Sequence, residues 1–410
     1  MSKQAVTTES NLWSSAQFQA YLASSAFTGG AFSMQQLLIS WMLVGILVLP
    51  GDQVGLIQAI IGIPALFLML LGGASADRVD PRLMLIRIYA VAWVIPLLLV
   101  TLIEIDLLNV WTVMLFGLGI STVTAYTSPA QQAVLSRIAS GDIQRAVTAA
   151  TAVGFLVQII GLMIAGQMER AGLVSVLIAQ AICIALGAFT IARLSRVEVT
   201  TAPKIEPTWR TVIAGLQATY ANKNIYELLI VNFVSSIFNA GAFITVVPFI
   251  MKRAYDGDAL QLAIIMMIFY CGATVSGFVM LRFMPLLRPG RIFLLLQLSR
   301  VVIIGLLWIK PDWWLLMLAM LAWGLNMGMT TTLARAIVQE SAAPEFRASI
   351  LSVYSIGLLG SAPIGALVLG IIIESFGTLN ALIPAMLVSL ALFLYGVFAT
   401  GIWSYHSPQA

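Results

Sequence analysis

The sequence predicts an all-α membrane protein, with twelve transmembrane helices in two six-helix bundles related by pseudo-symmetry. The 410 residues are 60% hydrophobic and only 9% charged, whereas soluble domains carry about 25% charged residues. The apolar residues form continuous runs of about 20, the helix length that crosses a hydrocarbon core of about 30 Å. These runs lack the strict apolar and polar alternation of a membrane β-barrel. Landmarks of the first half of the chain also recur in the second half.

Each predicted span is an apolar run, and the loops between the runs hold most of the charged, Gly and Pro residues. In chain order the runs cover residues 18–48, 53–75, 82–104, 108–132, 144–168, 171–193, 227–250, 258–283, 291–309, 313–336, 347–373 and 378–402.

The basic residues predict the orientation of these spans. If the spans alternate in direction, most of the 21 Lys and Arg residues fall on the side of the N-terminus, and only Arg170, Lys252, Arg253 and Lys310 fall in loops on the other side. Because Lys and Arg are retained on the cytoplasmic side of short loops, we expect both termini to be cytoplasmic. The N-terminal residues lack the pattern of a secretory signal, so we expect the first helix to remain as a span.

An internal repeat indicates a duplicated six-span unit. Matching landmarks lie 202 to 205 residues apart, and the pairs are Gly73 and Gly277, Arg145 and Arg347, Glu169 and Glu374, and Gly172 and Gly377. The predicted organisation is an N-terminal bundle at 1–193, a cytoplasmic linker at 194–226 and a C-terminal bundle at 227–410.

The linker contains apolar residues at helical spacing, namely Trp209, Val212, Ile213 and Leu216. This spacing is typical of a short helix lying on a membrane surface. A solvated tether with a few apolar residues is an equally good interpretation of the same stretch.

The sequence offers little for metal, thiol or nucleotide chemistry. Cys183 and Cys271 both lie inside predicted spans, and the single histidine, His406, lies in the C-terminal tail. A zinc site needs about four His, Cys or acidic ligands, and no phosphate-binding Gly-x-x-x-x-Gly-Lys loop is present. We therefore expect no metal, no cofactor and no enzymatic activity.

The net charge of +4 reflects loop topology, so we expect no nucleic-acid partner.

The segment between the second and third spans carries a family resemblance. Gly73, Asp77, Arg78 and Arg82 match the loop motif Gly-x-x-x-Asp-Arg-x-Gly-Arg-Arg of the major facilitator superfamily, and Asp80 and Pro81 depart from it. The chain around the motif is similar to the branch that contains the enterobactin exporter and macrolide efflux proteins. The residues that carry this narrower resemblance are Val54-Gly55-Leu56, Pro64, Ile337-Val338-Gln339-Glu340, Pro344, Arg347 and Pro363-Ile364-Gly365-Ala366.

The resemblance implies a conformational latch on the cytoplasmic side. Asp77 lies at the C-terminal end of a helix, where the helix dipole disfavours a carboxylate, so it needs a cationic partner. By the resemblance, Asp77 faces the start of the eleventh span near Arg347, and Gly73, Arg78, Arg82 and Arg137 complete the latch. The alternative is that these charges only end the helices and set the topology. Leu281 occupies the acid's position in the second half, so the latch is expected to be one-sided.

Transporters built from such repeats bind substrate near the bilayer midplane, between the two halves. By the resemblance, the first, fourth, seventh and tenth spans line the cavity. Polar residues at mid-span or on neighbouring helices are the candidate lining, and structural hydrogen bonding between helices is an equally good role for each of them. These candidates are Gln35, Gln36, Thr124, Tyr126, Gln158, Asn239, Tyr270, Asn326 and Thr330.

All seventeen acidic residues lie in loops or near span ends. This distribution disfavours a cationic substrate, because no carboxylate is available at the midplane. Proton coupling is implied by the resemblance alone, with Glu104, Glu227, Glu340 and Glu374 as peripheral candidate sites.

Arg300 is a charge embedded in the ninth span. It lies nine residues beyond Arg291, roughly 13 Å along a helix, where a charge costs about 2.5–3.5 kcal/mol on insertion scales. It therefore needs a partner, for which backbone carbonyls, polar side chains and an anionic substrate are the alternatives.

Together these features predict a monomeric secondary transporter of the bacterial inner membrane, with lipid, a small molecule and protons as its partners. The expected activity is export of a neutral or anionic amphipathic compound, such as a siderophore or a drug, by alternating access. The alternatives are an importer or lipid flippase of the same fold, or a non-transporting membrane sensor.

Overall fold

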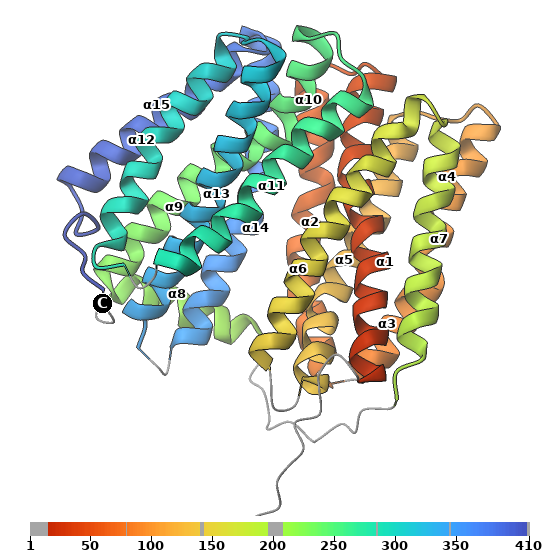
Figure 1. Cartoon of the computed structure of the whole chain (residues 1–410), viewed down its shortest axis with the longest axis horizontal. Helices are drawn as coiled ribbons and strands as arrows, with labels where there is room; N and C mark the ends of the chain where they lie inside the picture. Colours follow the sequence, from red (N-terminus) through yellow and green to blue (C-terminus); the bar gives the residue numbers. More distant parts are fainter. Residues whose placement is uncertain are drawn as a thin grey trace, which may run out of the picture.

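The computed structural model describes residues 15–78, 80–139, 143–195, 208–283, 286–343 and 346–407. Throughout these ranges the regular secondary structure is helical (Figure 1). Twelve helical stretches are long and apolar enough to cross a membrane, as the sequence predicted.

The helices of the first half supply six spans, some of which are built from two elements. In chain order they are α1 (Ala16–Trp41) with the π-helix η2 (Met42–Ile46), α2 (Gly51–Arg78), α3 (Pro81–Ala92) with α4 (Val94–Glu104), α5 (Val110–Ile138), α6 (Ile143–Gly166) with the 3₁₀ turn η3 (Gln167–Glu169), and α7 (Leu173–Ala192).

The second half begins with a short helix, α8 (Thr208–Ala221), and continues with six spans. These are α9 (Lys223–Gly241) with η4 (Ala242–Val246), α10 (Val247–Phe249) and η5 (Ile250–Ala254), then α11 (Ala259–Phe283), α12 (Pro289–Trp308), α13 (Trp313–Ser341), α14 (Arg347–Phe376), and η6 (Asn380–Leu382) with α15 (Ile383–Phe398). Several helices extend past the predicted apolar runs, because a helix continues into the interface after its hydrophobic residues end.

The two residues that depart from the superfamily loop motif begin a helix. The Asp80 side chain accepts a hydrogen bond from the backbone N of Arg82 at 3.0 Å, and Pro81 occupies the first turn of α3. An acidic N-cap followed by Pro is a strong helix start, since it satisfies a free backbone N–H and fixes the backbone dihedral of the next residue. The departure at Asp80 and Pro81 thus has a local structural reason.

The helices before residue 193 pack mainly on one another, and so do those after residue 208 (Figure 1). Two helix pairs form the main contacts between these halves. They are α2 with α14, and α6 with α11.

Backbone conformation supports the duplication. Six described residues, four of them not glycine, have a positive φ angle. They form pairs at nearly the same separation as the sequence repeat, namely Val48 and Asp256, Asp106 and Lys310, and Gly172 and Gly377. Each pair lies in corresponding loops of the two halves. The first and seventh spans also both end in a five-residue π-helix, η2 and η5, a local feature that is rare in proteins.

The linker contains a helix, α8, as one of the two interpretations predicted. Ile213, Leu216 and Tyr220 on this helix are exposed, while a Cβ at Gly215 would collide with the backbone of Ser349 in α14. One face of α8 therefore packs against the second half and the other presents apolar side chains, as an interfacial helix does. The side chains of Trp209 and Val212 lie outside the described residues.

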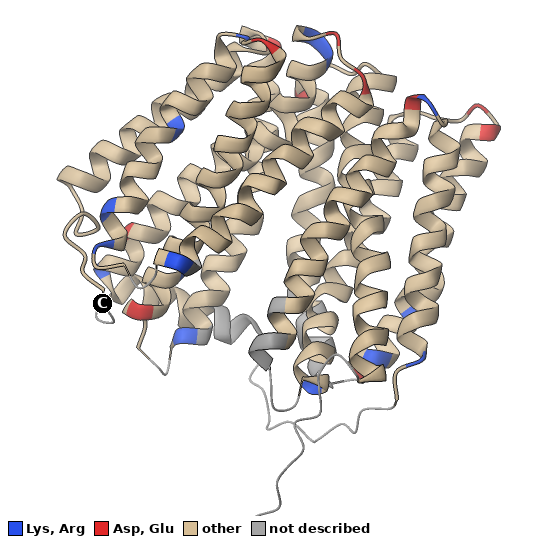
Figure 2. Ribbon diagram, in the orientation of Figure 1, with Lys and Arg blue, Asp and Glu red and all other residues tan. Residues whose placement is uncertain are grey.

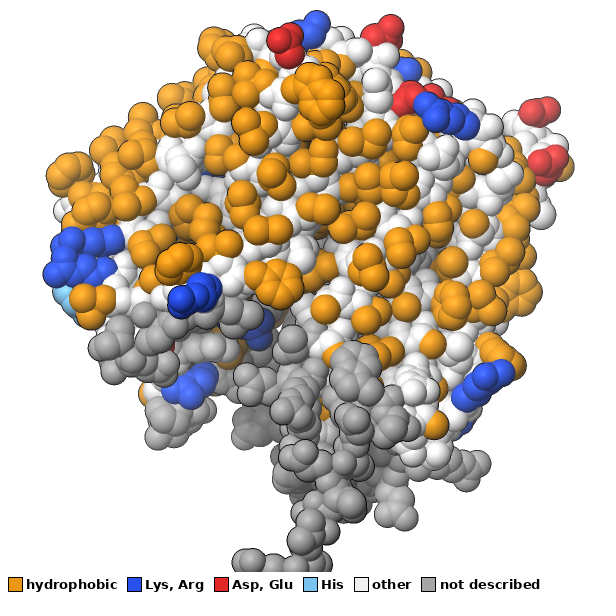
Figure 3. All heavy atoms as spheres, viewed as in Figure 1, with side chains coloured by type: hydrophobic (Ala, Val, Ile, Leu, Met, Phe, Trp, Pro, Cys, Tyr) orange, Lys and Arg blue, Asp and Glu red, His pale blue; other side chains and the backbone are white. Residues whose placement is uncertain are grey.

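The charged residues gather at the two ends of the molecule, and a broad apolar belt lies between them (Figures 2 and 3). We call the end that carries α8 the linker side and the opposite end, where α2 begins at Gly51 and α14 ends at Phe376, the distal side. This distribution of charge follows the predicted alternation of the spans.

Candidate functional site

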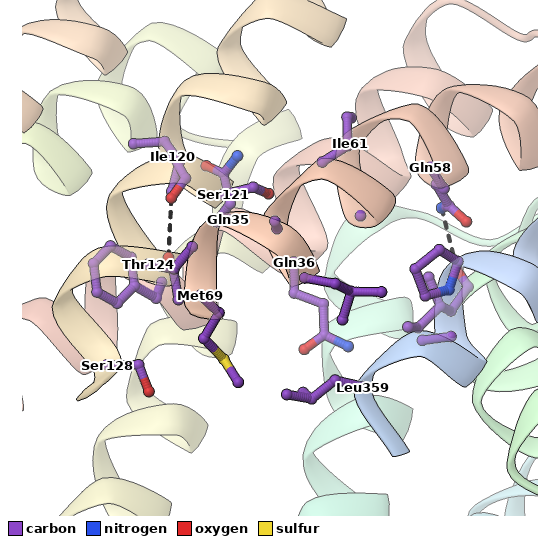
Figure 4. A pocket seen from close by; sticks show the side chains of 18 of the residues that line it. Gln35, Gln36, Gln58, Ile61, Met69, Ile120, Ser121, Thr124, Ser128 and Leu359 are labelled. Carbon is purple, nitrogen blue, oxygen red and sulfur yellow. Dashed lines mark hydrogen bonds between the residues drawn. The ribbon is translucent and has the colours of Figure 1, made fainter. Parts of the chain in front are cut away.

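A cavity of about 790 Å³ lies between α1, α2 and α5 of the first half and α14 and η4 of the second. Figure 4 shows Gln36, Met69 and Leu359 pointing into the same space from three different helices. Polar lining residues lie along the whole cavity, and they are Gln35, Gln36, Ser40, Gln58, Ser121, Thr124, Ser128, Gln132 and Ser355. Among the described residues that line it, none is Asp, Glu, Lys, Arg or His.

The cavity reaches toward the linker side. Ser128 and Gln132 are in the last third of α5, and Ser355 is in the third turn of α14. Gln132 and Ser355 are exposed. On the way to this side, a Cβ added at Gly360 in α14 would lie 3.4 Å from the Leu66 side chain in α2.

Close backbone packing shuts the cavity on the distal side. A Cβ at Gly51 would lie 2.8 Å from the carbonyl oxygen of Gly370, and one at Gly55 would collide with the backbone of Ala366. Small residues at i and i+4 allow two membrane helices to approach this closely. The α2 and α14 helices therefore touch along their backbones at this end.

Polar contacts reinforce the closure at the same end. Glu374 accepts a hydrogen bond from the backbone N of Gly51 in the other half at 3.0 Å, and it pairs with Arg253 at 3.5 Å. The Trp41 indole N–H donates to Glu169 at 2.7 Å, while Lys252 of the other half lies 5.5 Å from the Trp41 ring centroid. Of the two acids that the repeat paired, Glu374 joins the halves at the distal side, whereas Glu169 bonds to Trp41 within the first half.

Two cavity glutamines also bridge the halves. The Tyr270 hydroxyl in α11 donates to Gln36 Oε1 in α1 at 2.9 Å. The Thr245 hydroxyl in η4 donates to Gln58 Oε1 in α2 at 2.6 Å. Gln58 Nε2 lies 3.5 Å from the carbonyl oxygen of Ile244. In the two hydroxyl bonds the donors come from the second half and the acceptors from the first, whereas the long Gln58 contact runs the other way.

Gln35 is held by its own half. Gln180 in α7 donates to Gln35 Oε1 at 2.9 Å and to the carbonyl oxygen of Ala31 at 3.0 Å. The amide nitrogen of Gln35 is buried and has no hydrogen-bond partner within the described ranges. A buried donor without a partner is costly, and this nitrogen is covered by protein rather than presented to the cavity.

The structure brings three of the nine predicted cavity residues to the lining, Gln35, Gln36 and Thr124, with Tyr270 bonded directly behind Gln36. Tyr126 is partly buried against the core, and the backbone oxygen of Gln158 accepts from Ser33 at 2.6 Å. The lining uses the second and eleventh spans where the resemblance implied the tenth.

The remaining three predicted residues belong to a polar network inside the second half. Asn239 Oδ1 accepts from the Trp323 indole at 3.2 Å. Asn326 Oδ1 accepts from Arg300 Nε at 3.0 Å and from Nη2 at 2.8 Å, and Thr330 accepts from Nη2 at 3.3 Å.

Arg300 is 3% exposed, and all five of its N–H donors are used. Besides Asn326 and Thr330, the acceptors are Gln297 Oε1 at 2.9 Å and the Ser235 hydroxyl oxygen. Polar side chains are therefore the partners of this cation in the structure, and every one of them is neutral.

The predicted latch falls partly outside the described part of the structure, which includes neither the side chains of Asp77 and Arg78 nor the surroundings of Gly73. Arg82 Nη2 donates to the carbonyl oxygen of Ala192 at 2.7 Å, and Arg347 is exposed at the first residue of α14. Arg82 Nε and Arg137 Nη1 are buried without a hydrogen-bond partner in the described part of the chain.

Sequence reasoning missed the apolar half of the lining, including Ile61, Leu66, Met69, Leu359 and Pro363. These residues look like lipid-facing or core residues because hydrophobicity does not distinguish a cavity wall from a bilayer contact. The sequence did contain a signal that α2 packs closely against another helix, because Gly51 and Gly55 are two small residues four positions apart.

Comparison with known proteins gives the family. A family described as transmembrane secretion effector matches residues 12–402. The chain belongs to this family of the major facilitator superfamily. No curated protein sequence matches it. The narrower likeness to the enterobactin exporter and macrolide efflux proteins stays a prediction.

Solved structures share the fold of this secretion effector family member. The nucleoside transporter NupG is 18% identical with a TM-score of 0.76, covering 95% of this chain and 99% of that one. A POT family transporter in complex with 5-aminolevulinic acid is 11% identical with a TM-score of 0.73, covering 95% and 96%. An inward-facing, unoccupied bacterial homolog of the human lysosomal transporter Spinster is 14% identical with a TM-score of 0.64, covering 95% and 96%.

Proposed function

We propose that this protein exports a neutral or anionic amphipathic small molecule across a bacterial inner membrane by alternating access. The observation that carries the proposal is a cavity walled by amides, hydroxyls and apolar side chains, without an ionisable group among its described lining. A cationic substrate would have no counter-charge there, whereas an amphipathic one can bury its apolar surface and bond its polar groups. Met69 can adapt to different shapes, because methionine side chains repack readily.

Loading for export requires access from the cytoplasm. The cavity extends toward the linker side, and the basic residues favour that side as cytoplasmic. The proposed domain organisation is the 1–193 and 227–410 bundles joined by a cytoplasmic 194–226 linker. In this arrangement a monomer takes substrate from the cytoplasm and releases it after the distal side opens.

For proton coupling, we place the site at the distal side rather than in the cavity. Of the candidate acids, Glu227 accepts from the backbone N of Gly401 at 2.9 Å, and Glu340 accepts from Tyr405 at 3.1 Å, so both bond within the second half. Glu374 alone of these bonds to the other half, through Gly51. Protonation of Glu374 would weaken the hydrogen bond that it accepts from Gly51 across the halves and favour opening of this side.

The test is flux in inside-out membrane vesicles and in proteoliposomes of defined orientation. We expect uptake of an iron-free tris-catechol siderophore or a neutral macrolactone into inside-out vesicles, faster with the vesicle interior acidic, and no uptake of a quaternary ammonium drug. Movement only in the opposite direction would favour an importer. Movement of fluorescent phospholipid alone would favour a flippase. No flux of any compound by folded protein would favour a sensor.

A further inference from the structure

The hydrogen bonds from Tyr270 to Gln36 and from Thr245 to Gln58 combine two properties. Both acceptors line the cavity, and both donors lie outside the lining on helices of the other half. Thr245 is completely buried. Other hydrogen bonds between the halves in the described part of the chain include one between Tyr270 and the Gln158 side chain, the Gly51 contact with Glu374 and the long Gln58 contact with Ile244.

Both bonds lie just inside the distal closure. Gln36 precedes Trp41 by five residues in α1, and Gln58 follows Gly55 by three residues in α2. Separation of the halves on the distal side must break both bonds. Each bond therefore stabilises the closed distal side only while the glutamine oxygen accepts from the hydroxyl of Tyr270 or Thr245 in the opposite half.

We propose that Gln36 and Gln58 are positioning residues that couple substrate binding in the cavity to opening of the distal side. Substrate O–H or N–H groups replace Tyr270 and Thr245 on the two glutamine oxygens, so the acceptors stay satisfied while the halves part. A buried amide oxygen without a donor is costly, and for this reason an empty cavity keeps the distal side shut. The substrate assigned by this geometry is an uncharged or anionic amphiphile with at least two hydrogen-bond donors.

The role of the bonds is testable without a substrate, by the alkylation rate of a single-cysteine variant, Ser40→Cys. Ser40 lines the cavity and is 3% exposed. A membrane-impermeant maleimide applied to the distal face reaches position 40 only when that side opens. The two native cysteines are removed by Cys183→Ala and Cys271→Ala, so that they do not react. A separate Trp314→Cys variant identifies the membrane face that the reagent reaches, because Trp314 is 80% exposed at the start of α13.

We expect Tyr270→Phe and Thr245→Val each to raise the labelling rate about threefold to fifteenfold, the range for losing one interhelical hydrogen bond in a membrane. Thr245→Ser keeps the hydroxyl donor and should label at the wild-type rate, which a purely steric role of Thr245 would not predict. Tyr126→Phe is the matched control, because the Tyr126 hydroxyl has no hydrogen bond among the described contacts. Wild-type rates in both Tyr270→Phe and Thr245→Val, with the protein folded, would overturn the proposal.

The substrate step rests on the proposed function and has its own measurement. A neutral polyhydroxylated macrolactone should speed labelling of the wild-type background, whereas its per-O-methylated derivative, which lacks O–H donors, should not. The macrolactone should give no further increase in the Tyr270→Phe, Thr245→Val double variant. Equal acceleration by both compounds would overturn the donor requirement. Faster labelling of the variants without macrolactone flux would support the two bonds and contradict export of that compound.

Discussion

At the residue scale, Arg300 illustrates how this protein accommodates polarity inside the membrane. Its five N–H donors meet oxygens of Asn326, Thr330, Gln297 and Ser235, so no acid is required for its hydrogen bonds. The sequence predicted that the charge would have a partner and left the type open. Only the packing of α9 and α13 beside α12 decided in favour of neutral side chains.

We expect Asn326→Ala to destabilise the protein by about 2–4 kcal/mol, because two buried donors of a charged group lose their acceptor. Thr330→Val, which removes one 3.3 Å contact, should cost less than half as much. Thermal unfolding followed by tryptophan fluorescence in one detergent would rank the two variants. Equal melting temperatures for both would contradict the role assigned to Asn326.

Arg300→Gln distinguishes a structural cation from a substrate ligand. Since the described partners of Arg300 are all protein side chains, we expect the folded variant to retain flux of neutral substrates within about threefold, while its melting temperature falls as expected for loss of charge-assisted hydrogen bonds. Loss of flux at unchanged stability would instead indicate that Arg300 contacts substrate.

At the element scale, the contact of α2 with α14 decides which side of the molecule is closed. Hydrophobic run length predicted both helices, and the Gly and Pro residues inside them gave no sign of interrupting either span. The spacing of Gly51 and Gly55 indicates close packing of α2 against some other helix. That this helix is α14, with Gly370 meeting them backbone to backbone, could not be predicted, because the spacing does not identify the partner.

Gly55→Val should hold the distal side open. The added side chain would collide with the backbone of Ala366, and overpacking of this kind costs about 1–3 kcal/mol. That penalty applies to the closed conformation alone, so we expect the Ser40 cysteine to label about fivefold to 150-fold faster from the distal face. Gly154→Val is the control, since a Cβ there meets nothing within 4 Å. An unchanged rate in Gly55→Val would show that this contact does not control opening.

At the scale of the whole molecule, closure on the two sides should oppose each other. The family resemblance implied a latch on the linker side, centred on Asp77, and the structure adds a distal cluster built on Glu374, Gly51, Arg253 and Trp41. The repeat did pair Glu169 with Glu374, yet the pair is not used symmetrically. Glu169 bonds within its own half, whereas Glu374 reaches the other.

We expect Glu374→Ala and Asp77→Asn to shift the conformational balance in opposite directions. Loss of the bond to Gly51 and of a partly exposed ion pair should favour the outward-open form by about twofold to tenfold. Asp77→Asn should favour the form open to the linker side and lower flux. Labelling of the Ser40 cysteine from each face would measure both shifts. Shifts in the same direction would contradict the arrangement of two opposing closures.

The sequence by itself determined the membrane class, the number and order of the spans, the duplication and the superfamily, because hydrophobic run length and loop motifs are local properties of the chain. It also excluded an acid from mid-membrane, which follows from counting. Only the tertiary structure decided that α2 and α14 wall the cavity, that Gln36 and Gln58 bridge the halves, and that the distal side is the closed one. Those facts depend on which helix faces meet, and a membrane helix presents similar apolar residues to lipid, to a neighbouring helix and to a cavity.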